Sequence, residues 1–113
     1  MADCLFCNMA QGKMDVDKLY EDDLVFSIRD MHPRAPTHVM VIPKEHIPTA
    51  LDLTDDHSTV LGRLFAAAAQ VARQEGLDER GYRLAFNVGD QAGMTIAHLH
   101  LHMLGGRRLG PEG

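Results

Sequence analysis

The chain has 113 residues with a formal net charge of −5, of which 45% are hydrophobic and 24% charged. These values predict one globular domain over residues 1–113. They exclude a general nucleic-acid binder, because such a protein needs a broad basic surface. No apolar segment approaches the roughly 20 residues that a transmembrane helix needs, and no signal-peptide pattern is present. We therefore expect a cytoplasmic protein with no membrane partner.

The N-terminal part of the chain predicts a short helix followed by three strands. Residues 4–10 suit a helical turn, and residues 18–21 and 24–29 suit the two strands of a hairpin. Two prolines exclude a helix or a central strand over residues 30–36. Residues 38–43 are almost continuously apolar, which predicts a strand that is buried on both faces.

One long helix is expected in the middle of the chain. Thr54 is a suitable N-cap, and apolar residues recur every three or four positions up to Ala72. Gly76 is a suitable end for this helix. Residues 82–88 then alternate as a further strand, and residues 89–93 are typical of a loop.

Three histidines alternate with apolar residues in the last predicted strand, His98-Leu99-His100-Leu101-His102-Met103-Leu104. Strand periodicity predicts that the three imidazoles share one face, roughly 6–7 Å apart at about 3.3 Å per residue. The order β-β-β-α-β-β contains one long helix. It therefore predicts an α+β fold in which the helix covers one face of an antiparallel sheet.

Two chemical interpretations fit three neighbouring imidazoles. They can hold a catalytic metal ion with an open coordination position. They can instead act on phosphorus without a metal, where one ring attacks and its neighbours donate hydrogen bonds to the phosphate oxygens. A solvated edge strand is the third reading, which we favour less because histidine is uncommon and this strand is otherwise apolar.

The pattern His-φ-His-φ-His-φ-φ, where φ is apolar, resembles the histidine triad superfamily. Residues 35–47, Ala-Pro-Thr-His-Val-Met-Val-Ile-Pro-Lys-Glu-His-Ile, are similar to a second block of that family. Leu104-Gly105-Gly106-Arg107 is similar to the nucleotide-binding phosphoramidase branch rather than to the dinucleoside polyphosphate hydrolases. The resemblance covers about residues 4–107. It implies a HIT-like fold with a five-stranded antiparallel sheet, one long helix and a short N-terminal helix.

The resemblance also implies an activity and a homodimer whose two sheets join into one. The expected reaction is hydrolysis of purine nucleoside 5′-phosphoramidates, of the AMP–amine type, through a nucleotidyl-histidine on His100. An imidazole with a pKa near 6.5 is largely neutral at pH 7 and can attack without prior deprotonation. His102 would donate a hydrogen bond to the phosphate, and His38 would pass a proton to the leaving group. The carbonyl of His98 would fix the tautomer of His100.

The nucleotide partner, AMP or an AMP–amine conjugate, is expected to contact seven further residues. By resemblance, Asp30 accepts hydrogen bonds from the ribose hydroxyls, and Asn87 and Thr95 contact the phosphate. The base pocket would be lined by the apolar residues Ile28, Met31, Phe6 and Met9. For each apolar residue alone, packing in the core is the alternative.

The two cysteines, Cys4 and Cys7, form a C-x-x-C pair. In a compartment where disulfides are rare, metal ligation is the first interpretation and unligated structural cysteines are the alternative. His46 and His98 would complete a closed Cys₂His₂ set. The resemblance implies that this set holds a structural zinc ion and that catalysis requires no cofactor.

Two departures from the family pattern bear on specificity. Met94 stands where the family often has glutamine. The chain also has no tryptophan, whereas the phosphoramidase relatives carry one in the C-terminal tail. A dinucleoside polyphosphate hydrolase with the same nucleophile is a second enzymatic interpretation. A nucleotide-binding regulatory protein with weak activity is another, and a hydrolase with a metal on the three histidines is the last.

Overall fold

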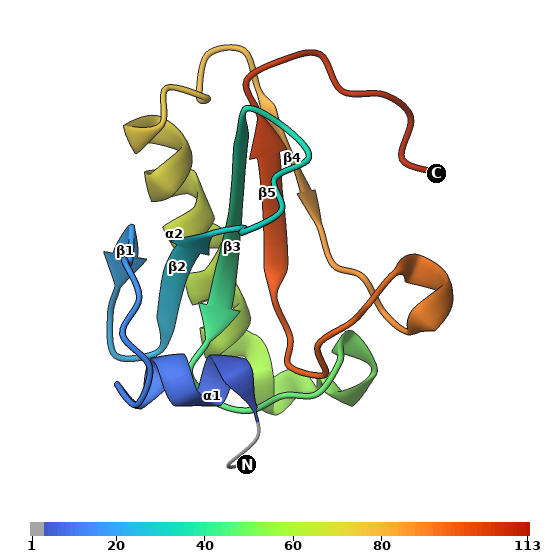
Figure 1. The fold of residues 1–113 in the computed structure, drawn as a ribbon. Helices are drawn as coiled ribbons and strands as arrows, with labels where there is room; N and C mark the ends of the chain where they lie inside the picture. Colours follow the sequence, from blue (N-terminus) through green and yellow to red (C-terminus); the bar gives the residue numbers. More distant parts are fainter. Residues whose placement is uncertain (1–3) are drawn as a thin grey trace.

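A computed structural model describes residues 4–113 and contains one layer of strands with helices packed around it (Figure 1). In chain order the elements are α1 (Leu5–Ala10), β1 (Tyr20–Glu21), β2 (Val25–Arg29), β3 (Thr37–Pro43), α2 (Ser58–Gln74), β4 (Tyr82–Ala85) and β5 (Leu101–Gly105), with short 3₁₀ turns at Ala50–Asp52, Asp55–His57 and Asp90–Ala92. The strands form one antiparallel sheet in the order β1-β2-β3-β5-β4. The predicted α+β fold is confirmed. Within the described residues, no helix combines the length and apolar character that crossing a bilayer requires.

The central strand β3 is buried on both faces, as its apolar sequence predicts. Val39 and Val41 join the core under α2, which runs along one face of the sheet (Figure 1). Met40 and Ile42 point to the other face, where they form a second apolar cluster with residues of α1 and β2. That second face is the one on which side chains of β3 and β5 can meet a ligand.

Thr54 caps the start of the long helix, as predicted, but the first turn differs from the expectation. The Thr54 hydroxyl accepts from the N–H of Asp56, and Nδ1 of His57 accepts from the N–H of Thr54 at 2.9 Å. This reciprocal capping box closes a 3₁₀ turn at Asp55–His57, and α2 itself begins at Ser58. The chain leaves α2 through Gly76, whose φ of +74° favours glycine.

The predicted strand over residues 98–104 is wrong at its start, because β5 begins only at Leu101. The N–H of Leu99 donates to the carbonyl of Ile47 (2.6 Å) and the N–H of His98 to that of Ile96 (2.9 Å). The N–H groups of His98 and Leu99 therefore bond outside the sheet ladder, although Leu99 still enters the core. Strand β4 ends at Ala85 instead of Val88 for the same reason, since Ala85 pairs with His102 close to the start of β5.

Gly106 fixes how the end of β5 meets the loop over residues 30–36. Its φ is +96°, and a Cβ atom at this position would lie 2.9 Å from Cβ of Pro36. The next residue, Arg107, donates from its guanidinium to the carbonyl of Arg34 (2.9 Å). The close approach at Gly106 thus holds the loop that carries Asp30 against the sheet.

We predict that Gly106→Ala lowers the free energy of unfolding by about 1–3 kcal/mol, because the new methyl group meets both backbone strain and Pro36. Gly62→Ala is the matched control: no atom lies within 4 Å of its added Cβ in α2, so it should be neutral or stabilising by up to about 1 kcal/mol. Urea denaturation of the two variants measures both values. Equal stability of Gly106→Ala and the wild type would contradict the close approach.

Candidate active site

A cavity of about 580 Å³ opens on the face of the sheet opposite α2. It is lined by all seven residues that the sequence suggested for the nucleotide, Phe6, Met9, Ile28, Asp30, Met31, Asn87 and Thr95, together with His100 and His102. Phe6, Met9 and Ile28 are buried, whereas Met31 is 85% exposed and leaves that edge open. The structure therefore brings an apolar wall, a carboxylate and two imidazoles to one cavity.

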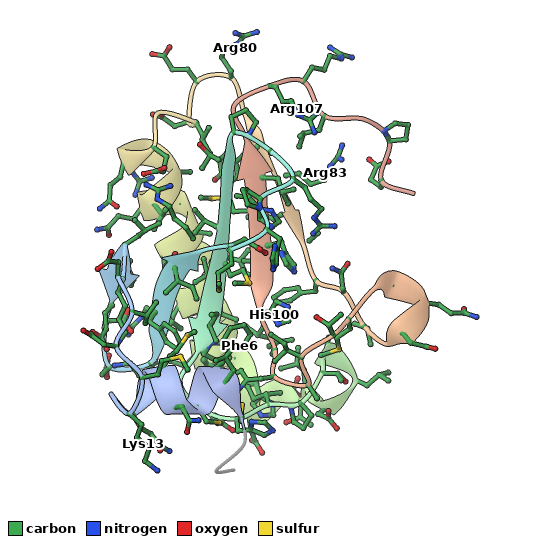
Figure 2. The ribbon with its side chains drawn as sticks, in the orientation of Figure 1. Phe6, Lys13, Arg80, Arg83, His100 and Arg107 are labelled. Carbon is green, nitrogen blue, oxygen red and sulfur yellow. The ribbon has the colours of Figure 1, made fainter. Side chains whose placement is uncertain are left out.

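His100 is held in one tautomer by the backbone. Its Nδ1–H donates to the carbonyl of His98 at 2.7 Å. A neutral imidazole has one N–H, so Nε2 keeps its lone pair. The edge of Phe6 lies against the ring, with 5.2 Å between ring centroids, and Figure 2 shows the two side by side near the start of β5. His100 is thus a buried, oriented imidazole with a free acceptor nitrogen.

His38 fixes the opposite tautomer in His102. The backbone N–H of Arg34 donates to Nδ1 of His38 (3.1 Å), so the proton of neutral His38 is on Nε2. That Nε2–H donates to Nδ1 of His102 at 2.9 Å, which leaves the proton of His102 on its own Nε2. The rings of His100 and His102 lie 4.9 Å apart between centroids, closer than the spacing predicted for an extended strand. The cavity therefore contains an acceptor nitrogen beside a donor nitrogen.

Burial keeps the imidazoles of His38 and His102 neutral. The pKa of His102 is lowered to about 4, mainly by burial and then by the nearby His100, His38 and Arg34, while Asp30 opposes the shift. Burial also lowers the pKa of His38, where Asp30 again opposes the shift and Arg34 adds to it. Both rings are therefore neutral near pH 7, as the hydrogen bonds from Arg34 to His38 and from His38 to His102 require.

Asp30, His38 and His102 approach one another closely enough to suggest a second metal group. Oδ2 of Asp30 lies 3.4 Å from Nε2 of His38 and 3.9 Å from Nδ1 of His102. A metal ligand needs a lone pair, yet Nε2 of His38 carries the proton because its Nδ1 accepts from a backbone amide. These three residues are therefore a hydrogen-bonded network rather than a set of ligands.

Cys4, Cys7, His46 and His98 form a group that can hold a metal ion. Nδ1 of His98 lies 3.3 Å from Sγ of Cys4, 3.6 Å from Sγ of Cys7 and 3.2 Å from Nδ1 of His46, and Sγ of Cys7 lies 3.2 Å from Nδ1 of His46. Tetrahedral bonds of about 2.3 Å to sulfur and 2.0–2.1 Å to nitrogen would separate two nitrogens by about 3.3 Å and nitrogen from sulfur by about 3.5 Å. The donor set fits such an ion.

The surroundings of His98 support ligation through Nδ1. Its Nε2–H donates to the carbonyl of Pro43 (2.8 Å), which directs the Nδ1 lone pair at the group. The N–H of Cys7 donates to Sγ of Cys4 at 3.4 Å. Burial lowers the pKa of the fully buried His98, so the ring is neutral as a ligand must be.

Three features of the site were not found from the sequence. Arg34 acts on His38 through a backbone amide, which no side-chain pattern reveals. Arg34 also lines the cavity, which its place in the Pro-containing loop over residues 30–36 did not suggest. Met94, which stands where the resemblance suggests that the family often has glutamine, is absent from the described residues that line the cavity.

Known proteins resemble this chain over most of its length. The model of the HIT domain matches residues 11–109. The purine nucleoside phosphoramidase of Escherichia coli (strain K12) is 44% identical over 107 residues, which cover 95% of this chain and 90% of that protein. A HIT family hydrolase from Legionella pneumophila is 46% identical, with a TM-score of 0.95 and coverage of 98% of this chain and 100% of that one. A HIT family hydrolase from Clostridium thermocellum is 40% identical, with a TM-score of 0.94 and coverage of 98% and 96%.

We predict that His102 stays neutral down to about pH 4 and carries its proton on Nε2. Nitrogen-15 NMR of the imidazoles measures both the pKa and the tautomer. The lowered pKa also means that the native state binds fewer protons than the unfolded chain between about pH 6.5 and 4, so stability falls as pH decreases through that range. A titration midpoint of His102 near pH 6.5, or a proton on its Nδ1, would contradict the hydrogen bonds from Arg34 to His38 and from His38 to His102.

Proposed function

Since this chain belongs to the HIT domain family, we propose that it is a nucleotide hydrolase that cleaves purine nucleoside 5′-phosphoramidates of the AMP–amine type. The observation that carries the proposal is the paired tautomers, with an acceptor Nε2 on His100 beside a donor Nε2–H on His102. A nucleophile and a donor for the phosphate oxygens are what transfer at phosphorus needs. The 44% identity to a purine nucleoside phosphoramidase supports this class of substrate.

In the proposed reaction Nε2 of His100 attacks the α-phosphorus, and the phosphorus–nitrogen bond breaks. The leaving nitrogen gains one proton from solvent and departs as an amine, while the nucleotide stays on His100. Water then attacks the same phosphorus, which releases AMP and returns a proton to solvent. Nδ1–H of His100 keeps its bond to the His98 carbonyl, so the ring spreads the positive charge that it gains. His102 donates to a phosphate oxygen throughout.

We assign His38 a positioning role rather than the proton transfer that the resemblance implies. Its Nδ1 accepts from Arg34, and its single proton is committed to His102. Loss of that proton would leave an imidazolate, and burial already disfavours the imidazolium that could donate one. His38 is therefore suited to hold the donor tautomer of His102.

The cavity supports the expected nucleotide contacts. The base would pack between Phe6, Met9 and Ile28, which are buried side chains of α1 and β2. Oδ1 of Asp30 accepts from the N–H of His32 (2.8 Å), which fixes the carboxylate for the ribose hydroxyls. Asn87 and Thr95 line the same cavity as the two imidazoles and are available to the phosphate.

We further propose that Cys4, Cys7, His46 and His98 hold a structural zinc ion, because two sulfurs and two nitrogens at tetrahedral spacing suit Zn²⁺. Neither Cys4 nor Cys7 is part of a disulfide, so both sulfurs are available as thiolate ligands. A closed set of this kind leaves no position for substrate and supplies a crosslink rather than a reaction step. It would tie α1, with Phe6 and Met9, to the segment before the catalytic strand.

The proposed homodimer would use the exposed edge of the sheet. Strand β4 lies at one end of the strand order, so one side of its backbone lacks a strand partner within the described chain. Pairing of two such edges would join two five-stranded sheets into one and remove an aggregation-prone edge.

We predict that His100→Ala lowers kcat for an AMP–amine substrate by about 10⁴-fold or more, because it removes the nucleophile. AMP should still bind, since Asp30 and the apolar wall remain, and calorimetry checks this. His57→Gln is the control: it removes an imidazole outside the cavity and keeps a side chain suited to the capping box. Turnover of His100→Ala close to that of His57→Gln would overturn the mechanism.

We predict one zinc ion per chain in the purified protein and its loss in His46→Ala, as measured by elemental mass spectrometry. Loss of a ligand frees α1, so affinity for AMP should fall by about tenfold or more. Glu45→Gln changes the neighbouring exposed residue and should keep both metal and affinity. Metal at full occupancy in His46→Ala would contradict the assignment of the ligands.

A further inference from the structure

A second cavity, of about 280 Å³, lies beside the first and is lined by Arg34, Arg83 and Arg107. Arg34, Asn87 and His102 line both cavities, so the two adjoin at the imidazole that we assign as the phosphate donor. The chain as a whole has a net charge of −5. Three guanidinium groups in one cavity are therefore a local feature rather than part of a generally basic surface.

The sheet places these arginines next to the site. Arg83 pairs with Leu104 and Ala85 with His102 across β4 and β5, so Arg83 and His102 point to the same face. Figure 2 shows Arg83 between Arg107 and His100 along the length of the sheet. The guanidinium of Arg107 donates to the carbonyls of Arg34 and Arg108, each at 2.9 Å, which orients it without neutralising it.

The charge of this cavity is largely uncompensated. Arg29 pairs with Glu75, and Arg63 pairs with Asp22 and Asp23. Within the part of the chain that the structure describes, no carboxylate forms such a pair with Arg34, Arg83 or Arg107. Glu112, in the tail, lines the cavity and is the single carboxylate among its lining residues. Positive charge therefore prevails, and guanidinium groups bind carboxylates and phosphates well.

The position of the cavity indicates which part of a substrate it can meet. In displacement at phosphorus the leaving group departs opposite the attacking atom. His100 lines only the first cavity, whereas His102 and Asn87 line both, so the arginine cavity adjoins the first one at the proposed phosphate contacts and not at the nucleophile. A leaving group that departs past His102 would enter it.

Resting on the hydrolase function proposed above, we propose that the arginine cavity binds an anionic group carried by the leaving group, and that Arg83 selects for it. The anionic group can be a carboxylate, as in an amino acid linked to AMP through its nitrogen, or a phosphate, and both share the negative charge that guanidinium groups bind. The reaction needs no further reactant: the phosphorus–nitrogen bond breaks, the amine gains a proton, and its anionic group stays paired with arginine until release.

The test compares three substrates that differ in the leaving group: AMP joined through nitrogen to glycine, the same conjugate of glycinamide, and ADP, which releases phosphate. We expect the wild type to prefer the glycine conjugate to the glycinamide conjugate by about five- to tenfold in kcat/KM, the size of a partly exposed charge-assisted bond. The preference should shrink as salt is raised. Arg83→Gln should reduce the ratio to about one.

Arg73→Gln removes the same charge from α2, away from the cavity, and should keep the wild-type ratio. A loss of ADP turnover in Arg83→Gln that matches the loss for the glycine conjugate would show that phosphate is also accepted; an unchanged rate with ADP would restrict the site to carboxylates. Equal turnover of the glycine and glycinamide conjugates by the wild type would overturn the inference even if Arg83→Gln failed to fold. Absence of turnover with every substrate would instead overturn the hydrolase function itself.

Discussion

The site depends on the hydrogen bond from Nδ1–H of His100 to the carbonyl of His98. The His98 carbonyl is available for that bond because β5 begins only at Leu101. Within the sheet ladder, a strand carbonyl would already accept from a neighbouring strand. His98 is itself held on both ring nitrogens, by the Pro43 carbonyl and by the cysteine and histidine group. The acceptor that orients His100 is therefore fixed by contacts that reach β3 and α1.

The second constraint is that the groups facing Nδ1 fix opposite tautomers in the adjacent imidazoles of His100 and His102. A carbonyl faces Nδ1 of His100, and the N–H of His38 faces Nδ1 of His102. One ring consequently presents a lone pair on Nε2 and the other a proton. Negative charge that grows on the phosphate oxygens during attack then has a donor already in place, so little reorganisation is needed.

Much of the fold follows from local patterns in the sequence. The apolar run of β3, the cap at Thr54 and the stripe of α2 each specify an element, and they lead to one helix on one face of a sheet. The start of β5 could not be predicted, because Leu99 reaches the core from an irregular segment and keeps the alternation that a strand would show.

The site was less accessible to sequence reasoning than the fold. The residue types around the nucleotide cavity could be proposed from family resemblance, yet the tautomers depend on the backbone groups of Arg34 and His98. The arginine cavity depends on strand register, which puts Arg83 on the same face as His102, and on the turn at Gly106. Neither the tautomers nor the arginine cavity can be predicted from the spacing of residues along the sequence.

Trapping of the reaction intermediate tests the central claim most directly. The protein is quenched in acid-free denaturant during turnover of an AMP–amine substrate, digested and sequenced by mass spectrometry. The account predicts a nucleotidyl group on His100 that disappears as substrate is exhausted. A nucleotidyl group on His102 or His98, or steady turnover with no adduct on any histidine, would contradict it.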